Sequence, residues 1–242
     1  MKWSDEGILL SSKPHGENSA IIEVFTSCHG RHIGLVKGGF SPKKISILQP
    51  GSQLDLVWSA RLQEHMGIFV VEVVKSRTAS LISNKIALSG FNSIASLLVM
   101  FLPEREPLKD FYAKTIFLIE SMQKGKEWLF LYIYWELFLL KEMGIGLDLS
   151  RCAVTGKTDF LKYVSPRSGR AVSEKSGELF KHKLLALPSF LISDQNIKVE
   201  DFKSLRDGFK LTEYFFDKWV SSAFKNGSLP EARSRFVSNI FG

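Results

Sequence analysis

Apolar residues in the first eighty positions come in short runs rich in β-branched side chains, separated by residues typical of turns. Runs of this length and composition predict β-strands rather than helices. The separating segments include Gly38-Gly39 and Gln49-Pro50-Gly51, which favour tight turns. The predicted strands are Gly7–Leu10, Ala20–Phe25, His32–Lys37, Gln53–Trp58 and Gly67–Val74.

These five short strands leave exposed edges unless the sheet closes, so the pattern favours a small closed barrel over residues 1–80. The five-stranded OB-fold is the commonest such barrel that binds nucleic acid. This step is an analogy at the level of the fold, and a fold alone does not establish a function.

From about Asn84 the apolar period changes to three and four residues, which is typical of helices. The segment Glu127–Met143 is apolar almost all round, which predicts a helix buried on most sides and ending at Gly144. The other predicted helices are Ile86–Leu102, Leu108–Met122, Leu211–Phe224 and a last one from Pro230 to Phe241. The expected fold class is therefore α+β, with a helical domain over residues 81–242.

Residues 151–178 interrupt the helical pattern with the spacing of a four-ligand zinc site. Cys152 and Thr155 form the first turn, and Ser173 and Ser176 form a second turn seventeen residues later. Three of these four positions carry hydroxyls, which are poor zinc ligands, so we predict no metal. On the spacing alone, a coincidence between two polar turns is the favoured interpretation. Between the turns, Tyr163–Val172 reads as a hairpin with Pro-Arg-Ser-Gly at its tip.

The composition is that of a folded protein: 45% of the 242 residues are apolar and 12% are aromatic, which excludes disordered and fibrous classes. No apolar run reaches the length of a membrane span, and the first residues lack the basic and apolar pattern of a signal peptide. We therefore expect a cytoplasmic protein without a membrane partner. The two cysteines cannot form a disulfide framework.

The net charge of +7 is concentrated in two segments. Residues 151–185 hold eight Lys and Arg against three acids, and the interval from Val24 to Leu54 holds Arg31, Lys37, Lys43 and Lys44 with no acid. Basic loops often serve solubility alone, but two acid-free or acid-poor basic segments favour a polyphosphate ligand.

Signatures of catalysis are missing. No phosphate-binding loop and no G-x-S-x-G nucleophile turn occurs, and no carboxylate cluster has convincing spacing for a metal-dependent nuclease. Cys28, His29 and His32 lack an evident fourth metal ligand, so we interpret them as a turn with a core cysteine and surface histidines. We predict no catalytic residue and no cofactor.

Several short stretches, in order and spacing, indicate a family. They are Asp5–Leu10 with His15-Gly16-Glu17; Val24-Phe25-Thr26 with His29-Gly30; Lys37-Gly38-Gly39 with Pro42-Lys43-Lys44; Leu48–Gly51; Glu136-Leu137 with Gly144–Leu149; Cys152 with Thr155-Gly156; and Leu229–Phe236. Over essentially its whole length, the chain resembles the RecO family of bacterial recombination mediators and DNA-repair proteins.

The resemblance implies an N-terminal OB-fold that binds single- and double-stranded DNA, followed by a helical domain with a zinc-finger-like insertion, here degenerate. It also implies strand annealing and work with RecR. The family further binds the acidic C-terminal tail of single-stranded-DNA-binding protein, so that the recombinase RecA can load. The tail should enter an apolar cleft on the helical domain rimmed by cations.

Carried onto this sequence, the resemblance makes the basic residues of the barrel candidates for DNA contact: Lys13, Arg31, Lys37, Lys43, Lys44 and Arg61. Phe25 and Phe40 are candidate stacking platforms, although a buried aromatic is the simpler interpretation of each. Arg167 and Arg170, at the tip of the predicted hairpin, either extend the DNA path, meet RecR or are solvated. An RNA-binding OB-fold protein with a helical platform for protein docking is the alternative function.

Overall fold

The computed structural model describes residues 1–192, 202–224 and 227–242, with the side chain of Lys43 excepted. The chain forms two compact units. The first, called the barrel unit here, comprises residues 1–119, 230–240 and 242, and the second unit comprises residues 120–229 and 241.

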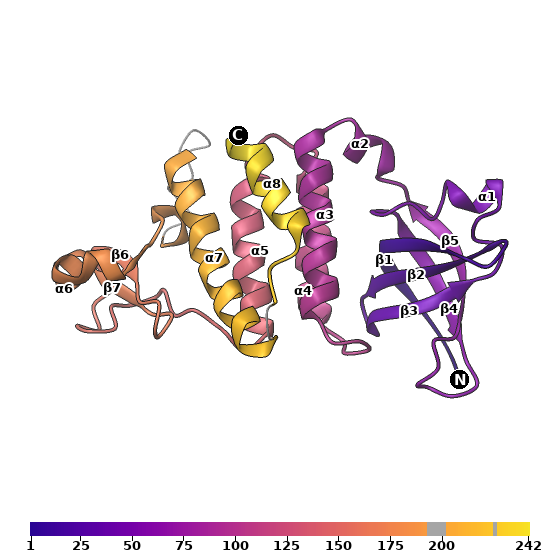
Figure 1. The fold of residues 1–242 in the computed structure, drawn as a ribbon, viewed down its shortest axis with the longest axis horizontal. Helices are drawn as coiled ribbons and strands as arrows, with labels where there is room; N and C mark the ends of the chain where they lie inside the picture. The colour runs from indigo at the N-terminus through magenta and orange to yellow at the C-terminus, as the bar shows by residue number, and fades with distance from the viewer. Residues whose placement is uncertain (193–201, 225–226) are drawn as a thin grey trace. The chain divides into compact units, whose positions relative to one another are not determined.

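Five strands close into a barrel in the barrel unit, which confirms the predicted OB-fold (Figure 1). The order around the barrel is β1-β2-β3-β5-β4, and β4 pairs back with β1. All pairings are antiparallel except that of β3 with β5, where Leu35 lies opposite Ile68. The strands are β1 (Lys2–His15), β2 (Ser19–Thr26), β3 (Gly30–Val36), β4 (Gln53–Ser59) and β5 (Ile68–Lys75).

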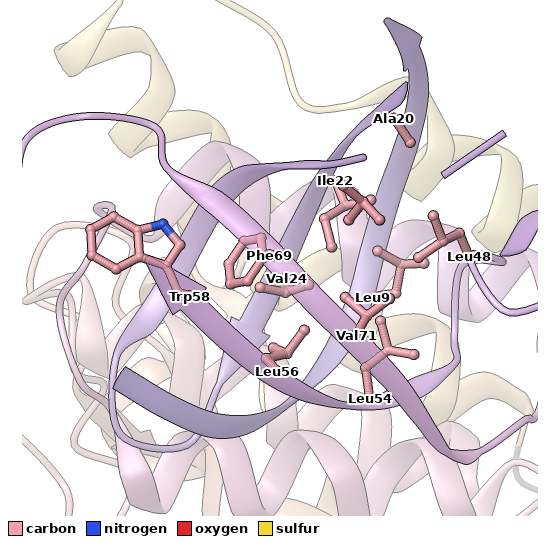
Figure 2. Packing of buried hydrophobic residues seen from close by; sticks show 11 residues of the cluster. Leu9, Ala20, Ile22, Val24, Leu48, Leu54, Leu56, Trp58, Phe69 and Val71 are labelled. Atoms are coloured by element: carbon pink, nitrogen blue, oxygen red, sulfur yellow. The ribbon is translucent and has the colours of Figure 1, made fainter. Parts of the chain in front are cut away.

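Alternate residues along the strands are buried in the barrel interior. Along β3, every second residue from Gly30 to Val36 is buried. The inward-facing side chains of all five strands meet in one cluster (Figure 2). Its members are Leu9, Ala20, Ile22, Val24, Val36, Leu48, Leu54, Leu56, Trp58, Phe69 and Val71.

Strand β1 is much longer than the predicted Gly7–Leu10. Its first half pairs with β4 and its second half with β2, with a register shift between Leu9 and Ser11. Gly7–Leu10 is the part buried at every position, and the flanking residues are mostly polar and partly exposed. Only this central part of β1 therefore has the apolar pattern that predicts a strand from the sequence.

Helices complete the barrel unit. Two are the predicted α3 (Lys85–Phe101) and α4 (Lys109–Ser121), of which α3 contacts β1. The side chain of Asn84 caps α3 by accepting from the amides of Ile86 and Ala87. The last helix, α8 (Glu231–Phe241), begins one residue after the predicted start, with Pro230 as its N-cap. Two short helices, α1 (Pro42–Ile45) and α2 (Thr78–Ile82), have too few residues to show a period in the sequence.

The second unit is built on two packed helices, α5 (Trp128–Glu142) and α7 (Phe202–Ala223). Helix α5 buries residues on most of its sides, as its largely apolar sequence predicts. Helix α7 begins well before the predicted Leu211 and continues through Gly208. A Cβ on Gly208 would lie 2.7 Å from the Cδ1 atom of Ile133, so this glycine permits the close approach of the two helices.

A small sheet of order β7-β6-β8 holds the insertion together. Its hairpin of β6 (Leu161–Val164) and β7 (Ala171–Ser173) confirms the predicted one. The remaining elements are α6 (Glu174–Gly177), η1 (Glu178–Lys183), β8 (Leu185–Ala186) and η2 (Ser189–Leu191). Within the described residues, no helix combines the length and apolar composition needed to cross a bilayer.

Candidate nucleic-acid interface

Three of the predicted DNA-contact lysines gather at one end of β1, β2 and β3. Lys13 lies opposite Ile21, and the adjacent Ala20 lies opposite Val36, which Lys37 follows. The Nζ atom of Lys44 donates to the carbonyl oxygen of Lys37 at 2.9 Å. We call Lys13, Lys37 and Lys44 the lysine cluster.

The turn between β3 and α1 brings Lys44 back to Lys37. Gly38 has a φ of 65°, a conformation that a side chain disfavours, and Pro42 starts α1. Lys13 and Lys37 are exposed, and Lys44 is partly exposed. The predicted contact Lys43 lies on α1, but its side chain is outside the described residues.

The two arginines predicted for the barrel differ from each other. Arg61 is exposed in the loop after β4. Arg31 instead forms an ion pair with Glu23, donates from Nε to the carbonyl of Leu102 at 2.9 Å, and lies 3.7 Å from Glu104. Its side chain is only 12% exposed, so its charge is already engaged inside the barrel unit.

Neither predicted aromatic platform presents an open ring. Phe25 is completely buried and packs against Phe111 and Tyr112, with ring centroids 6.1 and 5.5 Å away. It cannot stack on a base, and the simpler interpretation of a buried aromatic is confirmed for Phe25. Phe40 is partly buried and packs against the barrel core.

A stack of aromatic rings lies elsewhere in the barrel, near the start of β1. The rings of His29 and Trp3 are stacked, with centroids 4.0 Å apart and planes 7° from parallel. Trp58 stacks with Trp3 at 5.6 Å. We call His29, Trp3 and Trp58 the ring stack. A tryptophan in a predominantly polar segment was the only signal for it in the sequence.

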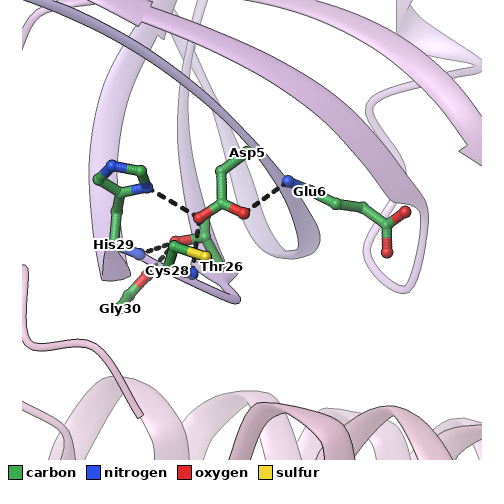
Figure 3. Close-up of polar contacts among 6 residues, drawn as sticks. All are labelled: Asp5, Glu6, Thr26, Cys28, His29 and Gly30. Carbon is green, nitrogen blue, oxygen red and sulfur yellow. Dashed lines mark hydrogen bonds and ion pairs between the residues drawn. The ribbon is translucent and has the colours of Figure 1, made fainter. Parts of the chain in front are cut away.

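Asp5 holds the turn that presents His29 (Figure 3). Its Oδ2 atom lies 2.8 Å from Nδ1 of His29 and accepts from the amide of Cys28 at 2.7 Å. Thr26 Oγ1 accepts from the amide of His29 at 3.1 Å and donates to the carbonyl of Gly30 at 2.9 Å. The position of the His29 ring is thus determined by the surrounding strands.

A cavity of about 560 Å³ lies beside the ring stack, and His32 forms part of its wall. His32 is 3% exposed, and neither of its ring nitrogens has a hydrogen-bond partner of good geometry among the described residues. Burial lowers the pKa of His32 to about 4, with help from the charges of Arg105 and His29 and against a weak effect of the His29 backbone. The imidazole is therefore neutral at pH 7.

The predicted core cysteine and surface histidines are thus reversed. Cys28 is exposed, whereas His32 is buried and His29 is partly buried. In the described part of the chain, no group of three or more His, Cys, Asp and Glu side chains is arranged to hold a metal.

In the second unit, the positions with zinc-ligand spacing do come together. The Sγ atom of Cys152 lies 3.5 Å from Ser173 Oγ and 3.3 Å from the Ser173 amide, and Ser173 Oγ donates to Ser176 Oγ at 3.0 Å. Burial opposes ionisation of the Cys152 thiol, but hydrogen bonds with Ser173 and Thr155 outweigh it and lower its pKa. Neutral hydroxyls that bond to one another do not suit zinc, so these residues do not fit the ion.

The arginines of the hairpin have different surroundings. Arg167 is exposed, and Arg170 pairs with Asp148 at 3.5 Å. A cleft of about 370 Å³ lies beside the hairpin tip, with Arg167 and Lys218 among its lining residues. Its apolar lining includes Ile145, Leu147, Phe215 and Trp219. Lys218 also donates from Nζ to the carbonyl of Pro166 at 2.8 Å.

Comparison with known proteins identifies the family to which this chain belongs. Residues 1–77 match the family model described as recombination protein O N terminal, and residues 83–227 match the one described as recombination protein O C terminal. The chain belongs to the RecO family. The DNA repair protein RecO of Roseobacter denitrificans is 47% identical over 237 residues, which cover 98% of this chain and 97% of the relative.

Other members of the RecO family match over similar lengths. The DNA repair protein RecO of Dinoroseobacter shibae is 43% identical over 98% of this chain and 97% of its own length. That of Beijerinckia indica is 42% identical, with 98% and 94% covered. RecO is a family of DNA-binding recombination mediators and not of enzymes, which confirms the non-enzymatic prediction.

Proposed function

We propose that this chain acts in DNA repair and recombination as a mediator that binds single- and double-stranded DNA with its barrel and anneals complementary strands. In this proposal it works with RecR to load RecA on DNA coated by single-stranded-DNA-binding protein. Family membership supports the general role. The lysine cluster supports DNA binding by the barrel.

The lysine cluster suits a sugar–phosphate backbone. Three cations from different elements gather at one end of the barrel, and the bond from Lys44 to the Lys37 carbonyl holds two of them together. Cations that track phosphates release counterions, so the affinity falls steeply with salt and depends little on sequence. We include Lys43 and Arg61 as contacts of the same kind, and we leave out Arg31 because its charge is paired.

Charge reversal of the cluster tests DNA binding. Lys37→Glu with Lys44→Glu should weaken single-stranded DNA binding by about tenfold or more at low salt, and should reduce the slope of log affinity against log salt by about one to two. A matched control is Lys85→Glu with Lys109→Glu, two exposed lysines at the starts of α3 and α4. Equal affinity of both variants at low salt would remove the lysine cluster from the DNA site.

The cleft beside the hairpin suits the acidic tail of single-stranded-DNA-binding protein. Its apolar wall of Phe215, Trp219 and Leu147 can receive an aromatic side chain, and Arg167 and Lys218 provide positive charge at the same place. Arg167 is proposed for this role rather than for the DNA path. Arg170 remains a candidate for contact with DNA or RecR, although its pairing with Asp148 reduces its free charge.

A tail peptide labelled with a fluorophore tests this site. Arg167→Glu and Lys218→Glu should each weaken peptide binding by about fivefold to tenfold, as expected for charge-assisted contacts. Lys210→Glu, an exposed lysine on the same helix, should have no effect. If all three variants bind the peptide like the unmodified protein, the tail binds elsewhere.

Annealing assays connect the two sites. On DNA coated with single-stranded-DNA-binding protein, we expect the chain to anneal complementary strands, and we expect deletion of the acidic tail to slow annealing. On uncoated DNA, the tail-site variants should anneal normally and the lysine variants should not. Adding RecR and RecA to the coated DNA then tests the loading step.

A further inference from the structure

We propose that the cavity beside the ring stack binds one unpaired nucleobase of single-stranded DNA, with His29 as the stacking surface. This inference rests on the proposed DNA binding but goes beyond it, because the lysine cluster contacts phosphates only. It concerns the other end of β1, away from the lysine cluster, where the predicted contacts Arg61 and Arg31 lie and where the charge of Arg31 is already paired.

The rings of the stack lie in the order Trp58, Trp3 and His29, and all three line the cavity. Trp58 is buried in the barrel core, Trp3 packs on it, and His29 packs on Trp3 with nearly parallel planes. The side chain of His29 is 32% exposed and lines the cavity. Because Trp3 covers one face of the imidazole, a planar ring in the cavity can extend the stack from the other face.

His29 is also fixed in place. Asp5, whose side chain is only 6% exposed, holds Nδ1 of His29 from behind, and the two flanking amides are bonded to Asp5 and Thr26 (Figure 3). A platform that is rigid before binding loses little conformational entropy when a base stacks on it. Stacking on aromatic side chains accepts any base, since every base has a π-face.

The other walls of the cavity fit a nucleotide. Lys2 and Arg105 contribute positively charged side chains to its lining, which contains no carboxylate. Arg105 is held in place, since its guanidinium donates to the carbonyls of Gln63 and His65 in the loop between β4 and β5. The volume of about 560 Å³ is ample for a base with its sugar.

His32 provides a reason for a polar ligand rather than a purely apolar one. Its ring lies against Trp3 and Trp58 in edge-on contacts, and its two nitrogens have no partner of good geometry among the described residues. A buried polar atom without a partner is costly, so a ligand that supplies a hydrogen-bonding edge is favoured. A nucleobase has such an edge, whereas a hydrocarbon side chain does not.

Abasic DNA separates stacking from phosphate contact. A short oligodeoxythymidylate and the same oligonucleotide with abasic sugars in its middle carry equal numbers of phosphates. The unmodified protein should bind the intact oligonucleotide on the order of tenfold more tightly, the size of one or more stacked bases. His29→Ala should bring this ratio close to one, and His29→Phe, which keeps a ring, should restore it.

Two control variants make the failures distinguishable. The charge-reversed lysine cluster should weaken both oligonucleotides and leave their ratio unchanged, and His15→Ala, an exposed histidine at the end of β1, should change neither. If the unmodified protein binds no DNA, the proposed function fails. If it binds DNA but His29→Ala keeps the ratio, only the base site is wrong.

Photocrosslinking provides a test that needs no variant. An oligonucleotide with 5-iododeoxyuridine, irradiated with the unmodified protein, should label the peptide that contains Trp3 or the one that contains His29. Labelling confined to other peptides would overturn the proposal even if His29→Ala does not fold.

Discussion

The barrel and the small sheet of the insertion are stabilised in different ways. The barrel closes five strands around a continuous apolar cluster of eleven residues. The sheet of β6, β7 and β8 has three short strands, and the hydrogen bonds of Cys152, Ser173 and Ser176 join its two turns. Many apolar contacts together stabilise a large core, whereas the stability of a small motif depends on a few polar groups.

The two regions also differ in which substitutions should lower their stability. In the barrel, burial of large side chains dominates, and polar loops at its ends can carry a binding function. In the insertion, four side chains occupy positions with zinc-ligand spacing but bond to one another. Cys152 and Ser173 are buried, so removing the Cys152 thiol leaves the Ser173 amide without that partner in a buried place.

The largest effect is expected from the barrel core. Trp58 is 1% exposed, and its Nε1 atom donates to the carbonyl of Met66 at 2.9 Å. Trp58→Ala should lower the free energy of unfolding by about 3–5 kcal/mol, because it leaves a cavity and an unpaired carbonyl. Urea denaturation followed by circular dichroism measures this loss. Leu62→Ala, at an exposed position, should change it by less than about 0.5 kcal/mol.

A smaller effect is expected from acid. The folded pKa of His32 is about 4, below its ordinary value of 6.5, so the unfolded chain binds the proton more readily between these two pH values. Its contribution to stability is complete above about pH 6.5 and is lost as the pH falls towards 4, at most about 3 kcal/mol.

His32→Phe tests this pH dependence. The variant keeps the ring against Trp3 and Trp58 and cannot take up a proton. Its denaturation midpoint should fall less than that of the unmodified protein between pH 6.5 and pH 4.5. Parallel pH profiles would show that another group causes the acid sensitivity.

The smallest effect is expected in the insertion. Cys152→Ala removes the partner of the Ser173 amide and hydroxyl and should lower the local stability by about 1–3 kcal/mol. Faster hydrogen exchange at the amides of β7 measures this change, and Cys152→Ser should restore most of the protection. A zinc chelator should leave the exchange rates of the unmodified protein unchanged. Slower exchange on adding zinc would contradict the interpretation of the site.

Periodicity was sufficient to predict the strands of the barrel and most helices, because burial on one face leaves a repeating pattern. Periodicity was insufficient where contacts with residues distant in the sequence decide the bounds of a helix. The sequence predicted a helix only from Leu211, whereas α7 also includes Gly208, against which Ile133 packs. The boundary predicted after residue 80 remains a prediction. It lies between the two matched family regions, whereas α3 groups with the barrel unit.

The candidate site was also predicted only in part from the sequence. Charge along the sequence identified Lys37 and Arg31 equally, and only the fold pairs Arg31 with Glu23 while leaving Lys37 exposed. The ring stack was not predicted, since Trp3 and His29 are far apart in the chain and meet through the pairing of β1 with β2 and β4.

The sequence by itself determined the barrel, the helices, the degenerate metal site and the family, because each depends on residue type and spacing along the chain. Only the tertiary structure decided which cations are free, which aromatic rings are open and where a cavity lies. Those properties depend on contacts between residues distant in sequence, and one ion pair or one buried face is enough to change what a side chain can bind.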